Sequence, residues 1–64
     1  MSETEKKAIT VTGKLLYPIH IGFPAFIQES DGYRRTSTVC AVLSDTPQIT
    51  VIETRNSVYS IQKV

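Results

Sequence analysis

Cys40 and His20 are the only cysteine and the only histidine in this chain of 64 residues. One cysteine cannot form an intrachain disulfide, and one cysteine with one histidine cannot complete a structural zinc site. A domain of this length lies near the lower limit at which packing alone can hold a core. We therefore expect a single domain that gains further stability by oligomerisation, with no metal and no cofactor.

Composition narrows the class of protein. A hydrophobic content of 41% argues against disorder, and a formal net charge of +1 provides no broad basic field. Nucleic-acid binding is therefore not expected. The start of the chain, "MSETEKKA", has no apolar segment, and no stretch is long enough to span a membrane. A lone free thiol fits a reducing compartment, so we expect a cytoplasmic protein without membrane contact.

The N-terminal half predicts a polar tail followed by strands. Residues 1–7 are polar and are expected to be a disordered tail, which leaves residues 8–64 as one β domain. Residues 8–16, "AITVTGKLL", alternate like a strand, and Gly13 predicts a bulge or bend within it. Residues 17–24 contain two prolines and predict an edge or an irregular crossing segment.

Further strands and turns follow in the rest of the sequence. The dipeptide Asp31-Gly32 predicts a type I′ hairpin turn after the strand "AFIQES". Residues 36–38 predict a capped turn, because serine and threonine hydroxyls bond nearby backbone amides. "VCAVL", "QITVIETR" and "SVYSIQ" are expected to be strands, with Asn56 at positive φ in the last turn.

These strands predict an all-β fold. No helical periodicity occurs, and five to six short strands in so small a domain favour an SH3-like barrel or a strongly bent antiparallel sheet. Several strands, such as "VCAVL" and "ITVI", are apolar on both faces. Either a partner covers the outer face, or the assigned strand parity is incorrect. We favour a partner, in a homodimer or higher homo-oligomer.

The residues argue against an enzyme. A nucleophilic trio would need His20 as its base, but His20 lies in an apolar run and is better explained as packed at an interface or lining a pocket. Cys40 lies between Val39 and Ala41 and is expected to be a buried, inert thiol. Three glycines cannot form a P-loop or a dinucleotide fingerprint.

Two polar clusters favour binding instead. "YRRTST" and "ETRNS" each place arginine beside hydroxyl or amide side chains, and an arginine fork suits phosphate or carboxylate. Backbone amides in the turn expected at residues 36–38 could add an anion-binding concavity. Aromatic residues around the clusters could stack on a base. The candidate ligand-binding residues are Tyr17, His20, Phe23, Arg34, Arg35, Thr36, Ser37, Thr54, Arg55, Asn56, Ser57 and Tyr59.

Three short elements carry a resemblance to a known class. The chain contains "GFPA" (G-x-P-A), "RTSTV" (R-T-S-x-V) and "TRNSVY" (T-x-N-S-x-Y), and the resemblance spans Gly22 to Ile61. In these elements it resembles very short β proteins of bacteriophages and prophages. Some such proteins are similar to inhibitors of bacterial immunity that sequester a nucleotide second messenger, such as an ADP-ribose derivative or a cyclic nucleotide. The resemblance implies an anti-defence role in the cytoplasm of a host cell.

The sequence therefore predicts a non-catalytic protein that sequesters a phosphorylated, nucleotide-derived small molecule. The alternative is a protein-interaction module that inhibits a host protein through a sheet edge or an aromatic patch, with "LLYPIHIGF" as the contacting segment.

Overall fold

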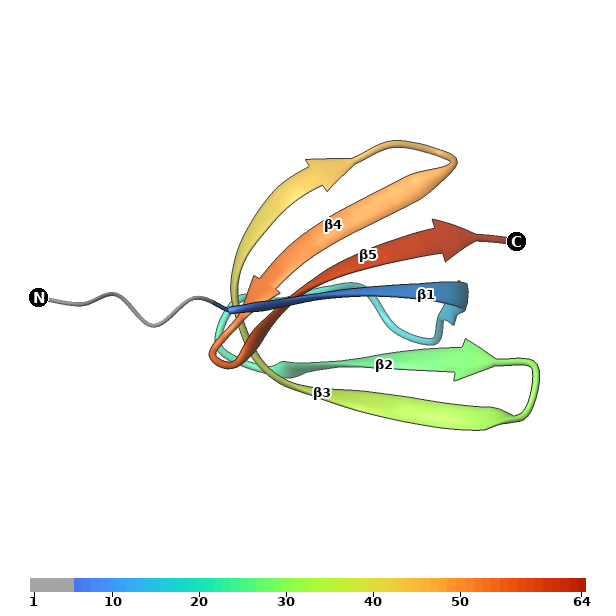
Figure 1. Cartoon of the computed structure of the whole chain (residues 1–64), viewed down its shortest axis with the longest axis horizontal. Coiled ribbons are helices and arrows are strands. Elements are labelled where there is room, and N and C mark those ends of the chain that lie inside the picture. The colour runs from blue at the N-terminus through green and yellow to red at the C-terminus, as the bar shows by residue number, and fades with distance from the viewer. Residues whose placement is uncertain (1–5) are drawn as a thin grey trace, which may run out of the picture.

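The computed structural model describes residues 6–64 as a five-stranded closed β-barrel (Figure 1). The strands are β1 (Lys7–Leu15), β2 (Pro24–Glu29), β3 (Gly32–Asp45), β4 (Ile49–Thr54) and β5 (Ser57–Lys63). The described residues contain no helix, so the predicted all-β barrel is confirmed. No helix of the described chain is long and apolar enough to cross a membrane.

Strand order around the barrel follows the chain, from β1 to β5. Each strand pairs antiparallel with the next one. Because the number of strands is odd, the first and last strands run in the same direction and close the barrel as a parallel pair. This pair runs in register from Lys7↔Ser57 to Gly13↔Lys63.

Gly13 is the point at which β1 changes partners. Up to Gly13 the strand pairs with β5, and the next two residues, Lys14 and Leu15, pair with Gln28 and Ile27 of β2. A Cβ atom at Gly13 would clash with the backbone carbonyl of Gln28, so a side chain does not fit here. The bend predicted at Gly13 is confirmed, and it joins the two sheets of the barrel.

β3 continues through residues 36–38, where the sequence predicted a turn. Its first half pairs with β2 and its second half with β4, with register shifts along both pairings. The Thr36 hydroxyl accepts a hydrogen bond from the amide of Ala25 at 2.9 Å and donates one to the carbonyl of Ser37. The turn prediction was wrong because this hydroxyl bonds to the neighbouring strand, and the anion-binding turn amides expected there do not form.

The core is small and partly polar. Its buried hydrophobic residues are Val11, Ala25, Ile27, Val39, Ile52, Tyr59 and Ile61. Four buried polar residues lie among the same strands: Thr36, Thr50, Thr54 and Ser57. The buried threonines use their hydroxyls in hydrogen bonds, which is the condition for burying such groups without a large penalty.

Both short hairpins form, although their backbone differs from the prediction. The β2–β3 loop contains Ser30 and Asp31, and the β4–β5 loop contains Arg55 and Asn56. No residue other than glycine has positive φ in the described chain. A type I′ turn needs positive φ at both of its central residues, and Asp31 does not have it, so the predicted turn type was wrong. The positive φ expected for Asn56 was also wrong.

The segment between β1 and β2, residues 16–23, crosses the barrel without forming a strand, as predicted. It is held to β3 by hydrogen bonds from Gly22 to the carbonyl of Val39 and from Val39 to the carbonyl of Phe23. Residues 1–5 of the predicted tail lie outside the described residues. Lys6 and Lys7 belong to the folded part, since Lys7 begins β1 and Lys6 contacts β4.

Candidate functional site

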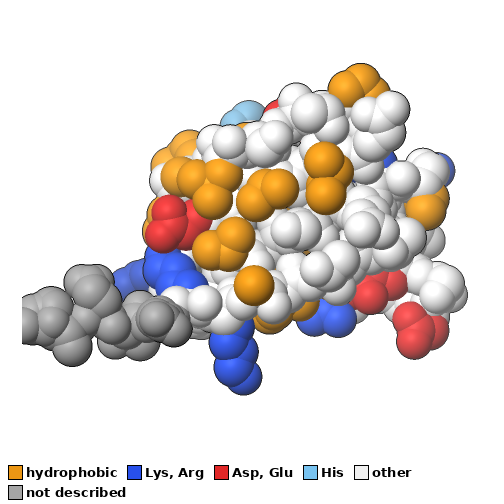
Figure 2. All heavy atoms as spheres, turned by 45° about the horizontal axis from the view of Figure 1, so that its top comes forward, with side chains coloured by type: hydrophobic (Ala, Val, Ile, Leu, Met, Phe, Trp, Pro, Cys, Tyr) orange, Lys and Arg blue, Asp and Glu red, His pale blue; other side chains and the backbone are white. Residues whose placement is uncertain are grey.

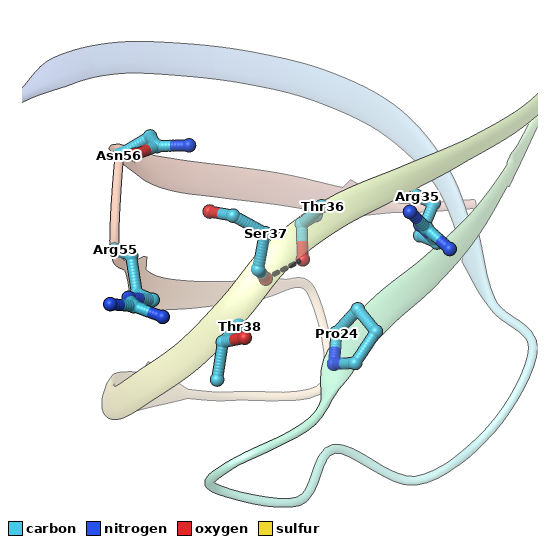
Figure 3. A pocket seen from close by; sticks show the side chains of 7 residues that line it. All are labelled: Pro24, Arg35, Thr36, Ser37, Thr38, Arg55 and Asn56. Atoms are coloured by element: carbon cyan, nitrogen blue, oxygen red, sulfur yellow. Dashed lines mark hydrogen bonds between the residues drawn. The ribbon is translucent and has the colours of Figure 1, made fainter.

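A polar pocket of about 450 Å³ lies where the first half of β3 approaches the β4–β5 loop (Figure 3). Its lining residues are Pro24, Arg35, Thr36, Ser37, Thr38, Arg55 and Asn56. The pocket therefore combines residues of both sequence clusters, and its two arginines lie 20 positions apart along the chain. The β3–β4 pairing brings them together, with the amide of Arg55 donating to the carbonyl of Thr38 at 3.0 Å.

The two arginines of the pocket have no charged partner among residues 6–64. Neither Arg35 nor Arg55 forms an ion pair or a side-chain hydrogen bond within residues 6–64, and both side chains are exposed. Figure 3 shows them at opposite ends of the pocket, with Ser37, Thr38 and Pro24 between them. Two uncompensated guanidinium groups give the pocket a positive potential.

The acidic side chains of the described chain lie elsewhere. Glu29 accepts from Arg34, Glu53 accepts from Lys6 at 2.7 Å, and Asp45 accepts from Lys63 at 3.1 Å. The remaining carboxylate, Asp31, lies in the β2–β3 loop and does not line the pocket. An anion entering the pocket would meet cations without a competing carboxylate among these residues.

Ser37 adds a polar group that the fold itself does not use. Its hydroxyl oxygen is buried and has no hydrogen-bond partner among the described residues. Figure 3 shows this hydroxyl pointing from β3 toward the side of the pocket formed by the β4–β5 loop. A buried hydroxyl without a partner costs about 1–3 kcal/mol, and a ligand oxygen at this position would remove that cost.

Arg34 differs from its neighbour Arg35. It lies on the other side of the strand, and its ion pair with the half-buried Glu29 occupies its Nε. The hydrogen bond to Glu29 raises the pKa of the Arg34 guanidinium, with smaller contributions from the charges of Glu29 and Tyr59. We therefore assign Arg34 to the stability of the barrel and not to the pocket.

Three other predicted ligand residues are part of the fold. Thr54 is fully buried, and its hydroxyl donates to the carbonyl of Ser57 at 2.9 Å and accepts from its amide at 3.1 Å. Tyr59 belongs to the buried core. Thr54, Ser57 and Tyr59 therefore shape the β4–β5 hairpin from inside and do not line the pocket.

The predicted aromatic and histidine contacts also lie outside the pocket. Tyr17, His20 and Phe23 are exposed on the crossing segment, where Tyr17 packs edge-on against Phe26 and His20 packs edge-on against Phe23. The histidine is therefore neither buried at a core position nor part of this pocket. No aromatic residue of the described chain lines the pocket.

Sequence reasoning missed Pro24 and Thr38, which line the pocket together. The two residues are cross-strand partners, so their proximity depends on the β2–β3 register. One signal could have pointed to Pro24: a proline at the start of a strand cannot donate a ladder hydrogen bond, and such positions border irregular backbone. Thr38 was missed because residues 36–38 were predicted to form a turn, whereas they belong to β3.

The guanidinium and hydroxyl groups of the pocket can bind an anion. No group of three metal-ligating side chains occurs among residues 6–64. Cys40, expected to be buried, is exposed and lies near the carbonyl of Thr38, with a sulfur–oxygen distance of 3.7 Å. That prediction was wrong because a register shift between Val39 and Ala41 leaves Cys40 without a strand partner. Its thiol does not line the pocket.

Comparison with protein-family models, with curated proteins and with solved structures finds no match for this chain.

Proposed function

We propose that this protein binds and sequesters a phosphorylated small molecule, without turnover, in the pocket between β3 and the β4–β5 loop. One observation carries the proposal: two arginines and a buried serine hydroxyl line the same cavity, and none of the three has a side-chain partner in the part of the chain that the structure describes. Guanidinium groups bind phosphate oxygens in a bidentate geometry, and a hydroxyl can donate to a further oxygen.

The required affinity sets what the pocket has to supply. To deplete a signal present at micromolar concentration, a sequestering protein needs a binding free energy of roughly −10 kcal/mol or better. Two charge-assisted arginine contacts contribute about 1.5–3 kcal/mol each. The remainder has to come from the rest of the ligand and from a rigid pocket, since preorganisation reduces the cost of ordering. Strand residues 35–38 and a loop of two residues supply such rigidity.

We further propose that the ligand is nucleotide-derived and that its sequestration in the host cytoplasm lets a phage evade the immune defence of the bacterium. The support for this step is the resemblance in the G-x-P-A, R-T-S-x-V and T-x-N-S-x-Y elements. Two of these elements, residues 35–39 and 54–59, supply the five pocket residues that carry hydroxyl or guanidinium groups: Arg35, Thr36, Ser37, Thr38 and Arg55. The same elements that carry the resemblance thus carry the polar groups of the cavity.

Mass spectrometry of captured molecules tests the proposal. The protein is incubated with a nucleotide-rich bacterial lysate, recovered, washed and denatured, and the released small molecules are identified. We expect a phosphorylated compound to be released chemically unchanged from the wild type, and to be strongly depleted from the double variant Arg35→Ala/Arg55→Ala. Lys14→Ala, which removes one positive charge outside the pocket, is the matched control and should retain the compound. Recovery of a cleaved product, or equal recovery from the double variant, would contradict the proposal.

A second candidate function is inhibition of a host protein. It is favoured by the large exposed hydrophobic residues of the crossing segment, since Tyr17, Ile21 and Phe23 are each more than half exposed. Aromatic side chains in such a segment suit protein contacts. A pull-down separates the two candidates: stoichiometric retention of a host polypeptide, abolished by Phe23→Ser, without a small molecule, would favour the second.

A further inference from the structure

The pocket between β3 and the β4–β5 loop offers more hydrogen-bond donors than acceptors. Each of its two guanidinium groups presents five N–H donors and no acceptor. The Thr36 hydroxyl is already used, because it accepts from the Ala25 amide and donates to the carbonyl of Ser37. The Ser37 hydroxyl has no hydrogen-bond partner within residues 6–64, so its proton is free to donate. No carboxylate lines the pocket. These groups complement a ligand group that only accepts hydrogen bonds, as an ionised phosphate does.

The backbone of β3 adds a donor beside these side chains. The Leu16 amide donates to the carbonyl of Phe26 at 3.0 Å, so the backbone polar groups of Phe26 face β1 and turn away from β3. Phe26 and Arg35 are cross-strand partners, and in an antiparallel ladder the backbone groups of such a pair both point outward. The Arg35 N–H therefore points to the edge of β3 opposite β2, which is the edge that faces β4 further along.

The pocket has few groups that would recognise a base or a sugar. None of its lining residues is aromatic, so a base has no ring on which to stack. Ribose hydroxyls and exocyclic amino groups donate hydrogen bonds and need acceptors. The only side-chain carbonyl among the lining residues belongs to Asn56, which is exposed on the β4–β5 loop. The organic part of a ligand is therefore expected to project out of the pocket.

The placement of the arginines favours a ligand with two anionic groups. Figure 3 shows Arg35 and Arg55 at opposite ends of the pocket, with Pro24 and Thr38 between them. The volume of about 450 Å³ lies in the range of roughly 300–1,000 Å³ that is typical of small-molecule sites, and a single phosphate group does not fill it. Two phosphates joined by one bridging oxygen bring an anionic group to each end. In a cyclic dinucleotide, riboses separate the two phosphates and would have to enter the same cavity.

Other cations of the described chain do not form a comparable cluster. Lys6, Arg34 and Lys63 each form an ion pair with a carboxylate. On the face that Figure 2 shows, hydrophobic and uncharged side chains cover most of the surface, and basic side chains lie toward its margin. Arg35 and Arg55, which have no such pair within residues 6–64, line one cavity and can act on one ligand together.

We propose that the pocket recognises a diphosphate. Each arginine binds one of the two linked phosphate groups, the Ser37 hydroxyl and the Arg35 N–H donate to their oxygens, and the nucleoside or sugar stays outside. The inference rests on the proposed phosphate binding and narrows it to one chemical class, the diphosphate esters. Nucleoside diphosphates and diphosphate-linked sugars such as ADP-ribose belong to this class, and the site binds them without regard to the base.

Isothermal titration with a short series of probes tests the assignment. The wild type is titrated with adenosine, AMP, ADP, UDP and inorganic pyrophosphate, in buffer without divalent cations. ADP should bind at least about tenfold more tightly than AMP, because its second phosphate engages the second arginine. UDP should bind within about threefold of ADP, since a hydrogen bond to the base would change the affinity by more. Pyrophosphate should bind, and adenosine should not.

Single arginine variants show whether each guanidinium group takes its own phosphate. Arg35→Ala and Arg55→Ala should each lose the preference for ADP over AMP, because one guanidinium group remains for one phosphate. Lys14→Ala removes an exposed positive charge outside the pocket and is the matched control, which should keep the preference of the wild type. Thermal melting of each variant checks that it is folded.

Three results would overturn the diphosphate assignment. The first is AMP bound as tightly as ADP, which would leave phosphate binding itself in place. The second is a difference of about tenfold or more between ADP and UDP, because the site would then read the base. The third is the absence of binding by ADP, UDP and pyrophosphate alike. In that case the proposed function is judged separately: a phosphorylated compound without a diphosphate, captured from lysate, would support it while this assignment fails.

Discussion

The two halves of β3 belong to one strand but have different surfaces. Residues 32–38 pair with β2, and they carry Arg34, Arg35 and the serine and threonines of the pocket. Residues 39–45 pair with β4, contain no lysine or arginine, and expose Val42 and Leu43. Residues that line a polar cavity and exposed hydrophobic residues thus lie on a single continuous strand.

This difference shows how a very small barrel can separate two surfaces without a second domain. The strand changes partners between its halves, and the residues Ile27 and Ile52, which pair with the first and the second half, belong to the same core. Because the backbone is continuous, the pocket and the exposed hydrophobic residues of the second half of β3 fold and unfold together. The difference between them is confined to side chains at the surface.

If both halves of β3 share one core, shortening the core residue that pairs with each half should lower the free energy of unfolding by similar amounts. Ile27 is the cross-strand partner of Arg34 in the first half, and Ile52 is the cross-strand partner of Val42 in the second. Both are fully buried, so Ile27→Ala and Ile52→Ala should each lower the free energy of unfolding by about 2–5 kcal/mol. Denaturant unfolding followed by two probes should show a single transition for each variant. Loss of structure in one half alone would contradict the shared core.

The bend at Gly13 connects the two sheets to which the halves of β3 belong. Gly13→Ala should lower the free energy of unfolding by about 1–3 kcal/mol, because the added methyl group meets the backbone carbonyl of Gln28. Thr12→Ala, at the preceding exposed position, is the control and should have a much smaller effect. Thermal melting of the two variants side by side gives the comparison, and equal melting temperatures would mean that the bend tolerates a side chain.

Two hydroxyls on neighbouring elements separate a structural role from a binding role. Thr54→Val should lower the free energy of unfolding by about 1–2 kcal/mol, because it removes the partner of the Ser57 amide. Ser37→Ala should leave the free energy of unfolding unchanged or slightly raised, since this hydroxyl has no hydrogen-bond partner within residues 6–64, and should weaken ligand binding. Thr10→Val, at an exposed position, controls for the change in shape. Destabilisation by Ser37→Ala would show that its hydroxyl serves the fold.

A fall in pH should slightly destabilise the end of β3, where Asp45 lies. The hydrogen bonds from Lys63 and Thr50 lower the pKa of Asp45 below its ordinary value, with the charge of Lys63 as a further cause. A lowered folded-state pKa contributes stability above the ordinary carboxyl range, and this contribution is lost as pH falls through the lowered value. Because Asp45 is mostly exposed, the effect is small. The difference in melting temperature between wild type and Asp45→Asn should shrink below about pH 4. A difference that stays constant from neutral to acidic pH would contradict this.

The strands were predictable where local pattern decides the structure. Alternation in "AITVT", the glycine at position 13 and the prolines of the crossing segment each describe their own neighbourhood, and each prediction agrees with the barrel. The turn expected at residues 36–38 failed because Thr36 bonds to Ala25, eleven residues away. A hydroxyl that prefers a local turn and one that bonds to a neighbouring strand have the same sequence signature.

The chemical groups of the pocket were predictable from the sequence, but the set of residues that line it was not. Arg35, Ser37 and Arg55 were recognised as groups suited to an anion, and the β3–β4 pairing brings them to one cavity. Arg34 and Tyr59 were grouped with them because they are neighbours in sequence, yet strand alternation turns both toward the barrel. Only the strand register separates a residue that lines the pocket from its neighbour that does not.

Isothermal titration of the pocket variants tests the central claim most directly. Wild type, Arg35→Ala, Arg55→Ala and Lys14→Ala, each checked for unchanged melting, are titrated with ADP-ribose, with a cyclic dinucleotide and with inorganic pyrophosphate. We predict that at least one probe binds the wild type and Lys14→Ala equally, and that each arginine variant loses about 1.5–3 kcal/mol of binding free energy. Wild-type affinity retained in both arginine variants would contradict the claim and would show that these two arginines are solvated surface residues.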